Sequence, residues 1–169
     1  RGWTFDWLTV ERVRAMINAV LDMVKLQDKK LVLQLDSVDI SSVLDSVSAK
    51  LKNLCEAVGH SLEIRCKDNL PRVSADPIRL GQIVEHLASN AVKFTPKGGK
   101  IEVFAFHSPD GGVDIKITDT GIGMSAAAIE VATQSFRQVD GSLPRRHEGA
   151  GLGLSIALAV TGLHPGSLS

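Results

Sequence analysis

Four short segments, in a fixed order between residues 90 and 154, constrain this chain more than any other feature. They read NAVKFT (residues 90–95), DTGIG (119–123), FRQVD (136–140) and GAGLGL (149–154). The glycines of the second and fourth segments suit turns in which the backbone approaches a ligand closely. An asparagine amide oxygen suits a metal ion, and an aspartate can accept a hydrogen bond from the edge of a base. Together the four segments predict a nucleotide pocket.

Composition narrows the class of protein. A chain of 169 residues with 44% hydrophobic and 22% charged residues fits one globular domain plus an appendage. The 19 basic and 19 acidic residues cancel, so no charge excess points to nucleic acid or to an anionic membrane. Cys55 and Cys66 lack metal-ligand spacing and are expected to be small buried residues in a reducing compartment, which predicts a cytoplasmic location. No apolar run is long enough to span a membrane, although a parent protein could be membrane-anchored.

The N-terminal part of the chain is predicted to form a helix over residues 9–29. Its apolar residues recur at spacings of three and four, which is the seam of a helix that packs on partner helices: Val10, Val13, Ile17, Val20 and Val24. The seam is short, so packing of this helix on its own domain remains the alternative.

The rest of the chain alternates between strand and helix patterns. Strands are expected at 31–35, 62–66, 100–106 and 113–118, with a loop at 67–75 and a hairpin turn at 109–112. One helix is capped by Asp39 or Ser41 and stops at Gly59, and a second starts at Asp76-Pro77 and ends near Thr95-Pro96. Helices also follow near 125–132 and at 152–163. The predicted fold is a two-layer α/β (α+β) sandwich with a mixed, mainly antiparallel sheet and helices on one face.

The second helix has a buried and a polar face. The buried face is predicted to carry Ile78, Ile83, Val84, Leu87, Ala88, Ala91 and Val92. The polar residues three or four apart share the other face and could line a cleft: Arg79, Gln82, His86, Asn90 and Lys93. Asn90 then offers an oxygen to Mg²⁺ on ATP phosphates, and Lys93 offers a cation to the phosphates. The alternative is a solvated helix face, the usual fate of such residues.

Asp119 ends a predicted strand just before Gly121 and Gly123. Its carboxylate can accept a hydrogen bond from the amino group of adenine, which guanine lacks at that position. Gly121-x-Gly123-x-x-Ala126 also fits the dinucleotide-binding fingerprint. That alternative is disfavoured because the strand before it belongs to an antiparallel hairpin and residues 135–139 make a poor buried strand before Asp140.

The last glycine-rich segment, with Gly149, Gly151, Leu152 and Gly153, is expected to open a helix towards phosphate oxygens. It lacks the Lys-Ser/Thr pair of a P-loop. Residues 137–150 have the composition of a mobile lid, from which Arg145 or Arg146 could reach phosphate. Phe136 would anchor the lid hinge or simply pack in the core.

The order of these motifs resembles the ATP-binding domain of sensor histidine kinases, in the wider family that includes gyrase-type ATPases and Hsp90. The resemblance covers roughly residues 10–166. It implies that Asn90 is a magnesium ligand, that residues 1–30 end a dimerisation bundle, and that residues 31–169 form the ATP-binding catalytic domain. It further implies a homodimer formed through the N-terminal helix, and a response regulator or phosphotransfer protein as partner.

Three departures from the family qualify that expectation. None of the five histidines (His60, His86, His107, His147 and His164) fits the phosphoacceptor pattern, so transfer would go to a histidine outside this chain. His86 stands where the family carries a second asparagine, and it either acts as a base or marks weakened catalysis. The sequence ends with residues 164–169, where the family has a glycine pair and then two more strands, so these C-terminal strands are expected to be missing from this chain. A pseudokinase-like scaffold therefore remains the alternative, and a gyrase-like ATPase is disfavoured because its glutamate base is missing.

Overall fold

The computed structural model describes residues 31–123, 125 and 152–164. Its elements, in chain order, are β1 (Asp36–Val38), α2 (Ile40–Val58), β2 (Ser61–Cys66), β3 (Val73–Ala75), α3 (Pro77–Phe94), β4 (Lys100–His107), β5 (Val113–Asp119) and α5 (Leu152–Leu163). The helices predicted at 9–29 and near 125–132, and the predicted lid at 137–150, lie outside these residues. No helix of the described part is long and apolar enough to cross a membrane.

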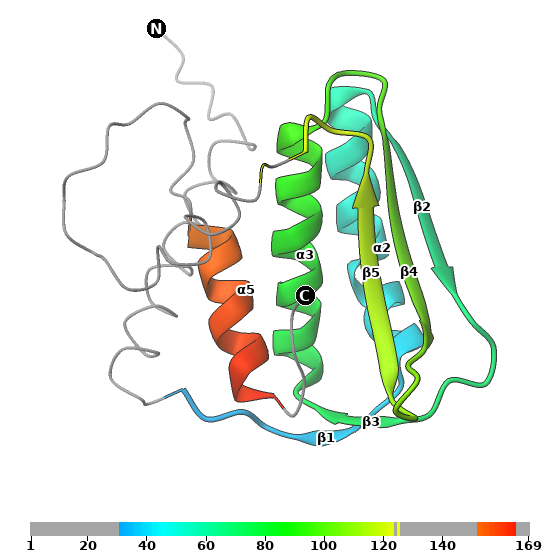
Figure 1. Ribbon diagram of the computed structural model, residues 1–169, viewed down its shortest axis with the longest axis vertical. Coiled ribbons are helices and arrows are strands. Elements are labelled where there is room, and N and C mark those ends of the chain that lie inside the picture. Colours follow the sequence, from blue (N-terminus) through cyan, green and yellow to red (C-terminus); the bar gives the residue numbers. More distant parts are fainter. Residues whose placement is uncertain (1–30, 124, 126–151, 165–169) are drawn as a thin grey trace, which may run out of the picture.

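The strands form a three-stranded sheet and a separate two-stranded ribbon. In the three-stranded sheet β4 lies between β2, to which it is parallel, and β5, to which it is antiparallel. The ribbon pairs β1 with β3 in antiparallel orientation. Helices α2 and α3 lie side by side on one face of the larger sheet (Figure 1). The predicted two-layer α/β fold with a mixed sheet is thereby confirmed.

The core lies between these two layers. The apolar residues of β4 alternate along the strand, and Ile101, Val103 and Ala105 have no exposed surface. They meet the apolar stripes of the two helices, which include Leu44 and Leu51 of α2 and Val84 and Ala88 of α3. Burial of such stripes is the main stabilising contribution of an amphipathic helix.

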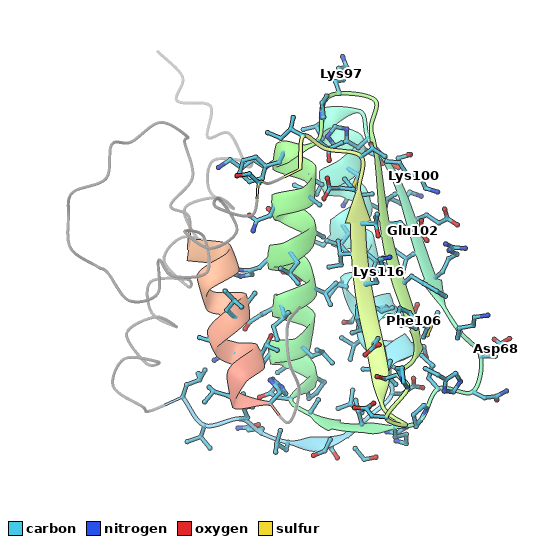
Figure 2. The ribbon with its side chains drawn as sticks, viewed as in Figure 1. Asp68, Lys97, Lys100, Glu102, Phe106 and Lys116 are labelled. Atoms are coloured by element: carbon cyan, nitrogen blue, oxygen red, sulfur yellow. The ribbon has the colours of Figure 1, made fainter. Side chains whose placement is uncertain are left out.

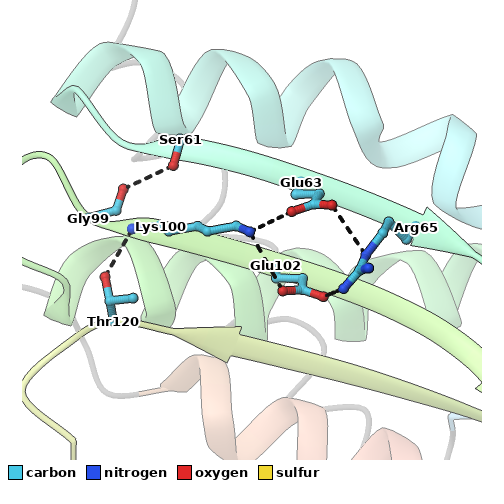
Figure 3. Close-up of polar contacts among 7 residues, drawn as sticks. All are labelled: Ser61, Glu63, Arg65, Gly99, Lys100, Glu102 and Thr120. Atoms are coloured by element: carbon cyan, nitrogen blue, oxygen red, sulfur yellow. Dashed lines mark hydrogen bonds and ion pairs between the residues drawn. The ribbon is translucent and has the colours of Figure 1, made fainter.

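The other face of the sheet carries charged side chains together with two stacked aromatic rings, Phe104 and Phe106. Lys100, Glu102 and Phe106 of β4 and Lys116 of β5 project from it (Figure 2). Lys100 Nζ lies 2.5 Å from Glu63 Oε2, and Arg65 bridges Glu63 and Glu102 (Figure 3). The hydrogen bond and the charge of Lys100 lower the pKa of Glu63. The charges of Glu63, Arg65, Lys100 and Glu102 thus pair with one another across β2 and β4.

The predicted helix boundaries of α2 and α3 are confirmed by their caps. Asp39 Oδ1 accepts the backbone N–H of Ser41 at 2.9 Å, and Gly59 closes α2 in the left-handed conformation at φ 79°. Asp76 caps α3, Pro77 follows at its first position, and Thr95 closes it with an Oγ1–H bond of 2.7 Å to Ala91 O.

Two predictions about strands are wrong. Residues 31–35 are not a strand, because β1 begins at Asp36, and its partner β3 lies inside the segment predicted as a loop. Leu31 and Leu33 instead pack against a cluster of residues from α3 and α5. Their alternation therefore reflects an extended segment with one face on helices, without a pairing partner at these positions.

Two predictions about burial are also wrong. Ile78 is 72% exposed, because it lies six residues, or about 240° around the helix, before the buried Val84. Cys55 is buried as expected, but Cys66 is exposed at the end of β2, which is an edge strand of the described sheet.

Candidate nucleotide-binding site

The C-terminal end of α3 and the turn after β5 meet through the backbone. The N–H of Ile122 donates to the carbonyl of Phe94, the last residue of α3, over 3.3 Å. Thr120 holds the start of the turn against β4: its N–H donates to Lys100 O at 3.1 Å, and its Oγ1 accepts the N–H of Lys100 at 3.0 Å (Figure 3). Two segments about 25 residues apart along the sequence, each predicted to face a nucleotide, therefore share one end of the domain.

Asp119 is the last residue of β5 and is exposed. Its Oδ1 accepts the N–H of Gly121 at 2.8 Å, which fixes the orientation of the carboxylate. Within the described residues its Oδ2 makes no hydrogen bond, so this oxygen can accept one from a ligand.

The turn has its shape because of glycine. A Cβ on Gly121 would lie 2.5 Å from Asp119 Oδ1 and 2.7 Å from Phe94 O, closer than any side chain can approach. Gly123 has φ 67°, in the left-handed region that glycine adopts without strain. Gly121 is thus required for the close approach of the turn to α3, and Gly123 for the left-handed backbone that follows it.

Asn90 and Lys93 of the predicted polar face belong to the last turn of α3, which ends at Phe94, the residue that bonds to the turn after β5. Asn90 is half-buried, and Lys93 is exposed with Nζ 5.2 Å from the centre of the Phe94 ring. His86, one turn earlier, is half-buried. At the other end of the helix Arg79 Nη1 donates to Gln82 Oε1 at 2.8 Å, so these two residues lie away from the turn.

Helix α5 lies antiparallel beside α3 (Figure 1). His164, just after its end, bonds to Asp76 at the start of α3. Because both helices rise by about 1.5 Å per residue, the start of α5 at Leu152 comes level with the turns of α3 near His86 and Asn90. Leu152 and Gly153 lie in this first turn of α5. Phe136, Arg145, Arg146, Gly149 and Gly151 lie outside the described residues.

The donor set is suited to a magnesium ion carried by a nucleotide. Asn90 supplies a neutral oxygen, and the described residues contain no group of three or more histidine, cysteine, aspartate or glutamate side chains that could hold a metal ion. Mg²⁺ in nucleotide sites commonly has one or two protein ligands and takes the rest from phosphates and water. A site of this kind fits Asn90.

Sequence reasoning missed the residues that hold the site in place. Thr120 was read only as part of a turn, and Asp76 only as a helix cap. The structural reason for Thr120 is its closeness to Gly99: a Cβ on Gly99 would lie 2.9 Å from Thr120 Oγ1, so the glycine leaves room for this hydroxyl. That juxtaposition appears only once the hairpin is folded.

Comparison with known proteins identifies relatives of this chain. Residues 75–169 match the family described as histidine kinase-, DNA gyrase B-, and HSP90-like ATPase. The chain is 37% identical over 169 residues to the signal transduction histidine-protein kinase BarA of Escherichia coli (strain K12), covering 95% of this chain and 18% of BarA. It is 36% identical over 153 residues to the histidine protein kinase DivJ of Caulobacter vibrioides, covering 90% of this chain and 25% of DivJ.

A solved structure shows the same relationship in three dimensions. Full-length ShkA, crystallised in complex with AMPPNP, superposes with a TM-score of 0.72 at 29% identity, over 88% of this chain and 30% of ShkA. The chain spans a quarter or less of the length of BarA and DivJ. The chain belongs to the histidine kinase-, DNA gyrase B- and HSP90-like ATPase family, as an ATP-binding domain of the sensor histidine kinase type.

Proposed function

We propose that this chain binds ATP together with Mg²⁺ where the end of α3 meets the turn after β5, and presents it for phosphoryl transfer to a histidine. The observation that carries the proposal is the bond from Ile122 N–H to Phe94 O, which brings the Asn90 and Asp119 segments together. The AMPPNP complex of the related ShkA supports the choice of an adenine nucleotide.

Each residue has a role that its surroundings permit. Asp119 accepts a hydrogen bond from the adenine amino group through Oδ2, because Oδ1 is held by Gly121 N–H. Asn90 contributes an oxygen to the magnesium ion, which neutralises phosphate charge when bound. Lys93 adds a second positive charge at the end of α3. His86, half-buried on the same helix, is the candidate for a polar contact to water or phosphate.

The phosphate end is assigned to the start of α5. Gly149, Gly151 and Gly153 with Leu152 would leave the first backbone N–H groups of this helix open to phosphate oxygens. Arg145 and Arg146 would close over the nucleotide, and Phe136 would anchor that lid. The role of the protein is then mainly positioning and charge neutralisation, which is typical of phosphoryl transfer.

The rest of the assembly is assigned by the same proposal. Residues 1–30 form the end of a dimerisation bundle and residues 31–169 the ATP-binding domain, with the acceptor histidine on a segment outside this chain. The working unit is a homodimer that passes phosphate to a response regulator or phosphotransfer protein, as a cytoplasmic part of the parent protein. The histidine kinases BarA and DivJ support this assignment.

Calorimetric titration with AMPPNP, with and without Mg²⁺, tests the proposal. We expect Asp119→Asn to weaken binding at least fivefold, because an amide offers a donor where adenine needs an acceptor, at a cost of about 1–3 kcal/mol. Asn90→Ala should abolish most of the gain from Mg²⁺, whereas Asp114→Asn, on the same strand but at its other end, should bind as the wild type does. Absence of binding by the wild type, or equal binding by Asp119→Asn, contradicts the proposal.

A second function is favoured by one observation. His86 occupies the site-facing helix one turn before Asn90, where the resemblance implies an asparagine. If histidine at this position prevents phosphoryl transfer, the domain binds nucleotide and serves as a scaffold. Supplying radiolabelled ATP to a protein that includes the upstream helix separates the two: label on histidine supports the kinase, and binding without label supports the scaffold. His86→Asn should then restore labelling.

A further inference from the structure

Asp76 joins three separate segments of the chain. Its side chain is almost fully buried, at 6% exposure. Oδ1 accepts the N–H groups of Ile78 and Arg79 at 3.1 Å each, as a helix cap does. Oδ2 accepts the N–H of Gln34 at 3.0 Å, and the backbone N–H of Asp76 itself donates to His164 Nε2 at 3.1 Å. A cap alone needs only the first pair of these bonds.

His164 can make its bonds in only one protonation state. Its Nδ1 lies 2.8 Å from Val160 O, a pure acceptor, so Nδ1 must carry a hydrogen. Its Nε2 faces the N–H of Asp76, a pure donor, so Nε2 must be bare. The neutral ring with the proton on Nδ1 satisfies both partners. His164 therefore connects the two helices: its Nδ1 bonds to α5 and its Nε2 to the start of α3.

Apolar contacts also join the segment 31–34, α3 and α5. Leu31 and Leu33 pack against the cluster formed by Ile83 of α3 and by Ala157 and Val160 of α5. Among the side chains that the structure describes, no residue of α5 belongs to the main core between α2, α3 and the sheet. Within the described residues, α5 is thus held by α3 and by the segment 31–34, not by the sheet.

We propose that Asp76 and His164 are positioning residues that couple the segment 31–34 to α5, so that a displacement of this segment moves the start of α5 relative to Asn90. The inference rests on the proposed nucleotide site for its consequence. A single 12-residue helix transmits a shift at its end to its start. The segment 31–34 directly follows residues 1–30, the proposed end of the dimerisation bundle. A change in that bundle would thereby reach the phosphate end of the site.

Amide hydrogen exchange tests the coupling without any nucleotide. His164→Leu removes the acceptor for Asp76 N–H, and Gln34→Pro removes the N–H that Asp76 Oδ2 accepts. Each should speed exchange in α5 about fivefold, the loss expected for one such hydrogen bond. His164→Gln keeps an acceptor near the place of Nε2 and should restore protection. The matched controls are His107→Leu, an exposed histidine at the end of β4, and Gln34→Ala, which retains the backbone N–H.

Unchanged exchange of α5 in both variants overturns the coupling. Equal acceleration in α2, which makes none of these bonds, also overturns it, because that result would reveal a general loss of stability. Titration with AMPPNP then tests the consequence: each variant should weaken binding about fivefold, and the double variant by little more than either, since both bonds lie on one path. Additive losses contradict a shared path. A wild type that binds no nucleotide refutes the proposed function, while the exchange result still decides the coupling.

Discussion

Gly121→Ala is the substitution from which the structure predicts the most. The added Cβ would lie 2.5 Å from Asp119 Oδ1, 2.7 Å from Phe94 O and 3.1 Å from Phe94 C. The Asp119 carboxylate can rotate away, but the Phe94 atoms belong to the backbone at the end of α3. Relief therefore requires the turn and the helix end to separate, which breaks the bond from Ile122 N–H to Phe94 O. Overpacking of this kind costs about 1–3 kcal/mol.

The separation should impair nucleotide binding as well as stability. The free energy of unfolding is measured by urea denaturation, and affinity by titration with AMPPNP and Mg²⁺. We expect a loss of about 2 kcal/mol in stability and a loss of affinity of at least tenfold, because Asp119 and Asn90 no longer face one site.

Gly111→Ala is the matched control for this experiment. Gly111 lies in the β4–β5 hairpin turn with φ 89°, and an added Cβ there meets nothing within 4 Å. Its cost, about 1–2 kcal/mol, comes from the left-handed backbone alone and should leave nucleotide affinity unchanged. If Gly121→Ala is as stable as the wild type, or if both variants lose affinity equally, the close approach at Gly121 does not have the role assigned to it.

Three further predictions concern stability and reactivity. Burial by itself would raise the pKa of Asp76, but the N–H groups of Arg79, Gln34 and Ile78 outweigh it and lower the pKa. The ionised carboxylate therefore stabilises the fold at pH values above the usual pKa of 3.8, and this stabilisation is lost as the pH falls through the lower pKa of the folded state. In acid denaturation, the difference in stability between the wild type and Asp76→Asn should disappear over that pH range. Leu44→Ala, at 1% exposure, should cost about 2–5 kcal/mol in urea denaturation, whereas Ile78→Ser, at 72% exposure, should change stability by less than about 0.5 kcal/mol; similar losses in both would contradict the observed burial. An aromatic disulfide reagent should label Cys66 in the native protein and Cys55 only after unfolding, because Cys55 is buried and Cys66 is exposed. Rapid labelling of both thiols in the native protein would be inconsistent with this packing.

The elements that sequence predicted best are those whose signals are local. Asp39 and Gly59 bracket α2, and Asp76-Pro77 opens α3, because capping depends on hydrogen bonds to residues only two to four positions away. The β4–β5 hairpin was predicted for the same reason, since its turn residues and both strands are contiguous.

Elements that depend on distant partners were predicted poorly. The alternation of Leu31, Leu33 and Leu35 resembles a strand, yet β1 forms only over the three residues that pair with Val73–Ala75. Nothing within residues 31–38 specifies which three those are, because pairing requires β3 to be brought alongside. The error at Ile78 has a different origin: the first turn of α3 is covered on the side of Leu80, whereas Ile78 faces the opposite side of the helix.

The candidate site combines both kinds of information. Asn90, Asp119, Gly121 and Gly123 were predicted because each belongs to a short motif, and the backbone bond between Phe94 and Ile122 then places these motifs at one end of the domain. His164 carried no motif at all and was noted only as a departure from the expected glycine pair. Its partner Asp76 lies 88 residues away, a separation over which no local pattern can predict a contact. Candidate site residues can thus be predicted from short patterns, whereas the contact between Asp76 and His164 emerges only from the folded chain.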